Sequence, residues 1–111
     1  MDPSQKILVE SLTNSTTAGK VRWTEVEAVT GADFFQAKLN AGTLHVFEMF
    51  DPKDGTRSIK LEVYGPSNQL ADTILVSEGD DFAALNDLFV AASRSARETD
   101  IIFDAILQEI R

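Results

Sequence analysis

The 111-residue sequence contains no cysteine, so it has no disulfide framework, thiolate zinc site or cysteine nucleophile. This composition is typical of a protein from a reducing compartment. Histidine occurs once, at His45, which leaves little material for acid–base catalysis or an imidazole metal site. Met1–Lys6 has no signal-peptide pattern, and no run approaches the roughly 18 apolar residues of a membrane-spanning helix. We therefore expect a cytoplasmic protein without membrane contact.

Cations are also scarce. Ten Lys and Arg stand against eighteen Asp and Glu, which gives a formal charge of −8 at pH 7. This balance disfavours a nucleic-acid partner, because phosphates are bound by clusters of cations. One explanation of the excess of carboxylates is solubility alone. The other is that the protein covers a basic surface of a partner protein, as an immunity protein or antitoxin does. Arg94 and Arg97 are one helical turn apart and either hold an anionic partner or pair with nearby carboxylates.

The N-terminal segment has the signals of a helix. Asp2 is the predicted N-cap, Pro3 suits the first helical position, and Gln5 completes a capping box. The Ser, Thr and Asn residues at 13–17 weaken the helical tendency. Gly19 is the expected left-handed residue after its end.

The middle of the sequence alternates between apolar and polar residues with a period of two, as strands do. The expected strands are 34–39, 44–50, 59–64 and 72–76, with 21–23 as a candidate fifth strand. Short turns such as Asp51–Gly55 separate them, so neighbouring strands should pair as antiparallel hairpins. The expected fold class is α+β, with one domain over residues 1–111. It comprises an N-terminal helix, an antiparallel β-meander of four or five strands and a long C-terminal helix, with both helices on one face of the sheet.

The C-terminal pattern is the longest in the sequence. Its mostly apolar positions are spaced alternately by three and four, without Gly or Pro: Phe82, Leu85, Phe89, Ala92, Ala96, Thr99, Phe103, Ile106 and Ile110. Asp80 or Asp81 is the expected N-cap. A continuous helix over 81–110 would be about 45 Å long, whereas a compact chain of this size is about 34 Å across. The helix must therefore overhang its domain or bend, at 93–95 or at 99–100.

A succession of landmarks also runs along the chain. It consists of Gly19-Lys20-x-x-Trp23, an aromatic strand around Phe34-Phe35, the meander, and Asp81-Phe82-x-x-Leu85-x-x-Leu88-x-x-x-Ala92. The whole chain resembles a group of small uncharacterised bacterial proteins with the same succession. The resemblance implies a bacterial cytoplasmic protein with a helix–meander–helix layout, and it carries no known activity, cofactor or catalytic residue.

One face of the expected sheet has an unusual composition. Strand alternation directs Phe34, His45, Phe47, Met49 and Tyr64 away from the helices. A sheet face in contact with water is normally polar, so this face is expected to meet a partner. Together with the distal part of the C-terminal helix it supplies the candidate interface residues: Phe34, Phe47, Met49, Tyr64, Phe103, Ile106, Leu107 and Ile110.

These features favour a non-enzymatic protein-interaction module. It would be a homodimer with a structural or regulatory role, or a protein that binds another protein in the manner of an immunity protein or antitoxin. The alternative is a small-ligand-binding protein with a pocket between the sheet and the C-terminal helix. Four aromatic residues would line that pocket: Trp23, Phe35, Phe82 and Phe89. An enzyme would have to combine His45 with carboxylates. We assign no catalytic, metal-binding or cofactor-binding residue and expect no cofactor.

Overall fold

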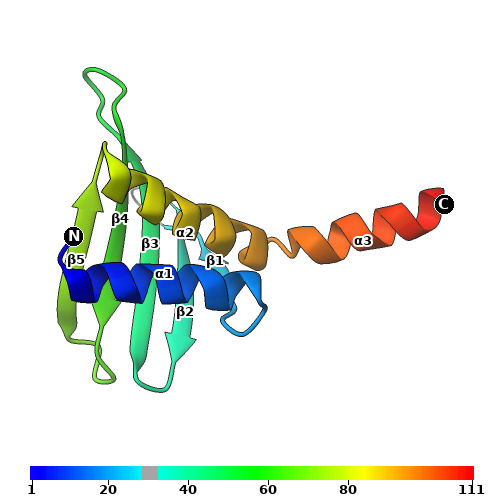
Figure 1. Cartoon of the computed structure of the whole chain (residues 1–111), viewed down its shortest axis with the longest axis horizontal. Coiled ribbons are helices and arrows are strands. Elements are labelled where there is room, and N and C mark those ends of the chain that lie inside the picture. Colours follow the sequence, from blue (N-terminus) through cyan, green and yellow to red (C-terminus); the bar gives the residue numbers. More distant parts are fainter. Residues whose placement is uncertain (29–32) are drawn as a thin grey trace.

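The computed structural model describes residues 1–28 and 33–111, and it confirms the α+β fold class (Figure 1). Its elements are α1 (Pro3–Thr17), β1 (Thr24–Val26), β2 (Phe34–Leu39), β3 (Gly42–Phe50), β4 (Arg57–Tyr64), β5 (Leu70–Val76), α2 (Asp80–Ala96) and α3 (Thr99–Ile110). The five strands form one sheet in the order β1-β2-β3-β4-β5, and all neighbours are antiparallel. This is the expected meander, with α1 and α2 on the same face of the sheet.

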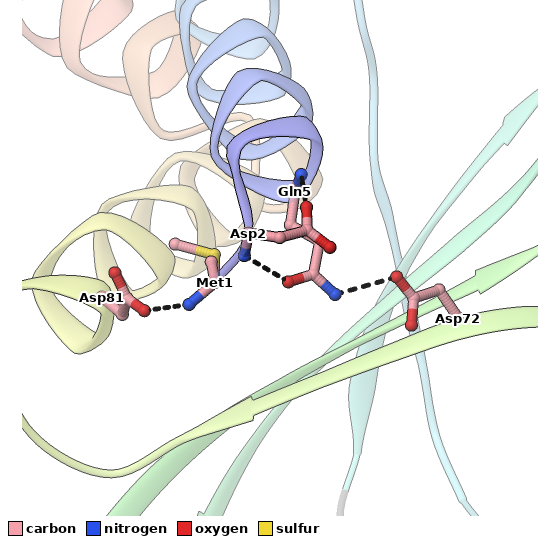
Figure 2. A network of polar contacts seen from close by, with 5 residues as sticks. All are labelled: Met1, Asp2, Gln5, Asp72 and Asp81. Atoms are coloured by element: carbon pink, nitrogen blue, oxygen red, sulfur yellow. Dashed lines mark hydrogen bonds and ion pairs between the residues drawn. The ribbon is translucent and has the colours of Figure 1, made fainter.

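A polar network fixes the start of α1 (Figure 2). The Asp2 carboxylate accepts a hydrogen bond from the Gln5 backbone N–H at 2.8 Å, and the Gln5 amide oxygen accepts one from the Asp2 backbone N–H at 2.9 Å. This is the predicted capping box. The Gln5 amide nitrogen also donates to Asp72 of β5 at 2.9 Å. The Met1 ammonium group pairs with Asp81 in the first turn of α2, and this hydrogen bond lowers the pKa of Asp81 from its ordinary value.

The end of α1 depends on a tertiary contact. The polar run at 13–17 stays helical through Thr17, although its residues favour other conformations. Thr16 is buried, and its hydroxyl oxygen accepts a hydrogen bond from the Trp23 indole at 2.9 Å. Packing of the helix therefore outweighs its weak local preference. Gly19 follows with φ of 78°, the expected left-handed conformation.

The fifth strand begins at Thr24, directly after the segment 21–23 that the alternation suggested. Trp23 does not join the sheet, because its side chain is buried and its backbone N–H donates to the Ser95 hydroxyl of α2 at 3.1 Å. The alternation around this residue therefore reflects core packing and not strand pairing.

The core fills the space between the sheet and the two helices that cover it. Its buried apolar residues come from α1, the strands and α2: Val9, Leu12, Trp23, Phe35, Ala37, Leu44, Val46, Ile59, Leu61, Ile74, Leu85, Leu88 and Ala92. Phe82 and Phe89 are partly buried and pack against this cluster. Leu39 lies on the same face of β2 as Phe35 and Ala37, but it is 46% exposed because it is the last residue of the strand, next to the β2–β3 turn.

The C-terminal helical pattern folds as two helices and not as one. Helix α2 ends at Ala96, and α3 begins at Thr99. Between them Glu98 has a left-handed backbone conformation, with φ of 52° and ψ of 36°. The break lies between the two expected bending sites, 93–95 and 99–100.

Helix α2 also begins differently from the prediction. Its N-cap is Gly79, with φ of 86°, and neither Asp80 nor Asp81 caps the helix. Both aspartates lie inside the first turn, where their negative charge interacts favourably with the helix dipole. A glycine reaches this backbone conformation without the steric penalty that an aspartate would meet there.

Candidate functional site

Helix α3 projects away from the rest of the molecule, and among the described elements it contacts only α2 (Figure 1). No residue of α3 is buried. Six large apolar side chains on it are between 43% and 73% exposed: Ile101, Ile102, Phe103, Ile106, Leu107 and Ile110. Five of them, all except Ile101, lie on one side of the helix, and we call these five side chains the α3 stripe. A helix of this length is marginally stable in water on its own, so the stripe needs a surface to cover it.

Two arginines at the C-terminal end of α2 form ion pairs with neighbouring elements. Arg94 forms an ion pair with Asp100 of α3, and its guanidinium carbon lies 5.7 Å from the centre of the Phe103 ring. Arg97 pairs with Glu25 of β1 at 3.1 Å. Both cations therefore pair with carboxylates, the second of the two roles considered for them. All these groups are largely exposed, so each ion pair contributes little to stability by itself.

The second uncovered surface is the outer face of the sheet, opposite α1 and α2. No helix of the described residues lies on it. We call its central side chains the outer patch: Phe34, His45, Phe47, Met49, Lys60 and Tyr64. Ring centres are separated by 4.7 Å between Phe34 and His45, 4.9 Å between Phe34 and Phe47, and 4.9 Å between His45 and Tyr64. The candidate interface residues of the sheet thus lie together where alternation placed them, and their use as an interface stays a prediction.

His45 lies at the centre of the outer patch. The Gln36 amide nitrogen is 2.9 Å from His45 Nε2 and donates to this ring nitrogen when the imidazole is in the neutral form with its proton on Nδ1. Burial lowers the pKa of His45, and the opposing charge of Glu62 raises it by a smaller amount. The surroundings of the imidazole are an aromatic cluster on an open face and not a cleft.

Lys60 supplies a positive charge on the same face. Its ammonium group lies 4.7 Å from the centre of the Phe47 ring and 3.9 Å from the Glu62 carboxylate. The Tyr64 hydroxyl donates to the other oxygen of Glu62 at 3.2 Å. These contacts hold the aromatic rings and the two charges in fixed relative positions.

Of the four aromatic residues expected to line a pocket, Trp23 borders a cavity, and the three phenylalanines are not among the residues that line it. Trp23 and Phe35 are core residues, and the Phe35 ring is 5.5 Å from that of Phe89. The guanidinium group of Arg57 lies 5.5 Å from the Phe82 ring centre and 5.7 Å from that of Phe89. These side chains fill the space between the sheet and α2.

A cavity of about 430 Å³ lies instead at the joint of α1, α2 and α3. Trp23 borders it together with Ala91 and Ser95 of α2 and Ile101 of α3. Sequence reasoning missed this cavity because its walls depend on the angle between α2 and α3. That angle follows from the backbone conformation of Glu98, which no periodic pattern records.

Within residues 1–28 and 33–111, no three His, Asp or Glu side chains gather closely enough to hold a metal ion. The same part of the chain contains no helix with both the length and the apolar character needed to cross a membrane. No protein-family model matches the sequence, and no match was found among curated proteins or among solved structures. The function must therefore be inferred from the exposure, charge and contacts of the chain's own side chains.

Proposed function

We propose that this chain is a non-enzymatic protein-interaction module that forms a homodimer through α3. The observation that carries this proposal is the exposure of the α3 stripe on a helix without a buried residue. Ile106 and Phe103 in the middle of the helix are 50% and 54% exposed. A contiguous apolar surface of this kind is typical of an interface.

The area of the stripe supports a dimer. A large apolar side chain that is half exposed offers roughly 100 Å² to a partner, so the five side chains of the stripe offer on the order of 500 Å². Two copies would together contribute about 1,000 Å², the area that a biological interface is expected to reach. A second copy is the natural partner because two-fold dimers are the commonest closed assemblies.

The proposed setting is the cytoplasm of a bacterium. The absence of cysteine and the resemblance to small bacterial proteins support it. The net charge of −8 is compatible with a regulatory or immunity-like role in which the dimer also covers a partner with a basic surface. In that case the carboxylates outside α3 would remain available to this partner when α3 is occupied by the second copy.

Light scattering after size exclusion, across the micromolar range, tests the dimer. Wild-type protein should have twice the chain mass of 12.2 kDa. Ile106→Asp should be monomeric, because it places a charge in the middle of the stripe. Gln108→Asp is the matched control, since position 108 is about 200° around the helix from 106, and it should stay dimeric. Wild-type protein at 12.2 kDa throughout would refute the proposal.

A second candidate function is small-ligand binding at the joint of the helices. The observation that favours it is the cavity of about 430 Å³ beside Trp23, a volume typical of ligand sites. Native mass spectrometry of protein purified from cells tests it. A retained small molecule that disappears in Ala91→Trp, which fills the cavity, would support this function. Protein without bound mass would contradict it.

A further inference from the structure

We infer that α3 of one copy packs on the outer patch of the second copy's sheet, and that the exchange is reciprocal. This inference rests on the proposed homodimer and names the surface that the α3 stripe meets. In residues 1–28 and 33–111, the exposed stripe on α3 and the half-buried aromatic cluster around His45 and Phe47 both lack a covering element. A helix on the outer face of the sheet would cover both surfaces with one contact and complete a third layer.

The dimensions of the two surfaces agree. Helix α3 has 12 residues, which gives it a length of about 18 Å. The sheet has five strands, and at about 4.8 Å between neighbours its width is roughly 19 Å. A helix that crosses the strands would therefore cover the outer patch on β2, β3 and β4 from edge to edge.

The charges of the two surfaces are complementary. Within Thr99–Ile110 there are three carboxylates and no Lys or Arg: Asp100, Asp104 and Glu109. The outer face carries Lys38 and Lys60 against Glu62, a local excess of positive charge in a chain of net charge −8. Two α3 helices packed on each other would instead bring together Asp104 and Glu109 of both copies, while Asp100 already pairs with Arg94. Opposite charges beside the apolar contact favour the sheet as the partner of α3.

The position of α3 is suited to a two-fold exchange. Helix α2 reaches the β1 side of the sheet through the Arg97–Glu25 pair, and α3 continues beyond that side from the helix layer (Figure 1). Rotation by 180° about an axis in the plane of the sheet exchanges its two faces. The helix layer of one copy is then level with the outer sheet face of the second copy. The α3 that extends from this layer would therefore lie over that outer face. The same rotation delivers the second α3 to the first copy, so the contact closes as a dimer.

Two variants that each damage one side of the contact test the arrangement. Ile106→Asp places a charge in the α3 stripe and leaves the outer patch unchanged. Phe47→Asp places a charge in the outer patch and leaves the α3 stripe unchanged. Reciprocal exchange predicts that each variant alone associates at least tenfold more weakly than wild type, or about 1.4 kcal/mol. An equimolar mixture should form a heterodimer, because α3 of the Phe47→Asp chain meets an intact patch on the other chain. Sedimentation velocity with one chain labelled measures this rescue.

Phe47→Asp could unfold the protein, so a second variant of the outer patch changes a charged side chain and no ring. Lys60→Glu reverses the charge of the outer patch and should also weaken the dimer at least tenfold. Lys53→Glu, in the exposed β3–β4 turn, makes the same charge change elsewhere and should leave the dimer unchanged. Circular dichroism verifies that each variant is folded.

The outcomes separate the inference from the proposed function. Rescue by mixing, together with a weakened Lys60→Glu dimer, supports packing of α3 on the sheet. A normal dimer for Phe47→Asp and Lys60→Glu, with a monomeric Ile106→Asp, would overturn the inference and leave a homodimer through α3–α3 contacts. Absence of a heterodimer in the mixture would also overturn it. A monomeric wild-type protein would refute the homodimer itself.

Discussion

Truncation of Leu85 to alanine should cause a large loss of stability. Leu85 is 0% exposed and projects from α2 into the core between the helices and the sheet. Removing its terminal carbons forfeits their transfer free energy and leaves a cavity, which costs about 3–4 kcal/mol at a well-packed site. Domains are stable by about 5–15 kcal/mol in total. At about 4 °C per kcal/mol for a chain of this length, the melting temperature should fall by roughly 12–16 °C.

Urea titration followed by tryptophan fluorescence measures this loss, because Trp23 is the sole tryptophan and is 3% exposed. The Ile106→Asp background keeps association out of the measured stability. Val90→Ala is the matched control on the same helix, since Val90 is 46% exposed, and it should cost less than about 0.5 kcal/mol. If Leu85→Ala unfolds at the urea concentration of this control, α2 does not pack on the sheet as described.

Three further predictions concern charged and titratable groups. Arg57→Met keeps the aliphatic stem but removes the guanidinium from between two α2 rings, so urea titration should show a loss of about 1–2 kcal/mol. The imidazole of His45 should titrate in NMR spectra with a midpoint below 6.5, because burial lowers its pKa. Since the folded state disfavours the protonated ring, stability should fall as the pH drops from above 6.5 through the folded pKa, and a His45→Gln variant should lack this slope. Asp81→Asn should melt below Asp80→Asn, and the difference should shrink in high salt, because only Asp81 pairs with the Met1 ammonium group. A fully stable Arg57→Met would contradict the contact of Arg57 with the two rings. A His45 midpoint at or above 6.5 would contradict the burial of its imidazole. Equal losses of stability for the two aspartate variants would contradict the Met1–Asp81 pair.

The parts of the fold that were predictable are the ones that local chemistry determines. In the turn Asp51–Gly55, the backbone N–H of Lys53 donates to the Asp51 carboxylate at 2.7 Å, and the N–H of Thr56 donates to Asp54 at 2.8 Å. Such turns close through neighbouring residues, so their sequence is sufficient to locate them. Strand alternation likewise placed Phe47 on the outer face, because successive side chains point to opposite sides.

The parts that were not predictable depend on residues far apart in the sequence. The α3 stripe was expected from its period, but the break before it was not located, since Ala96, Thr99 and Phe103 keep the same spacing across it. The contacts of the aromatic residues expected to line a pocket were not predictable for a similar reason. The guanidinium group of Arg57 in β4 packs beside the rings of Phe82 and Phe89 in α2, and such a contact between distant segments cannot be read from a periodic pattern.

The isolation of α3 also has a consequence for the order of folding. Its described contacts are with α2 alone, so the sheet and the two helices that cover it can reach their structure without it. Because synthesis runs from the N-terminus, these elements emerge from the ribosome before the segment Thr99–Ile110 does. The apolar segment is therefore the last of these elements to become available to other chains. Until it associates, its backbone amides should exchange with deuterium almost as fast as those of a free peptide, whereas those of β3 and β4 should be protected for far longer.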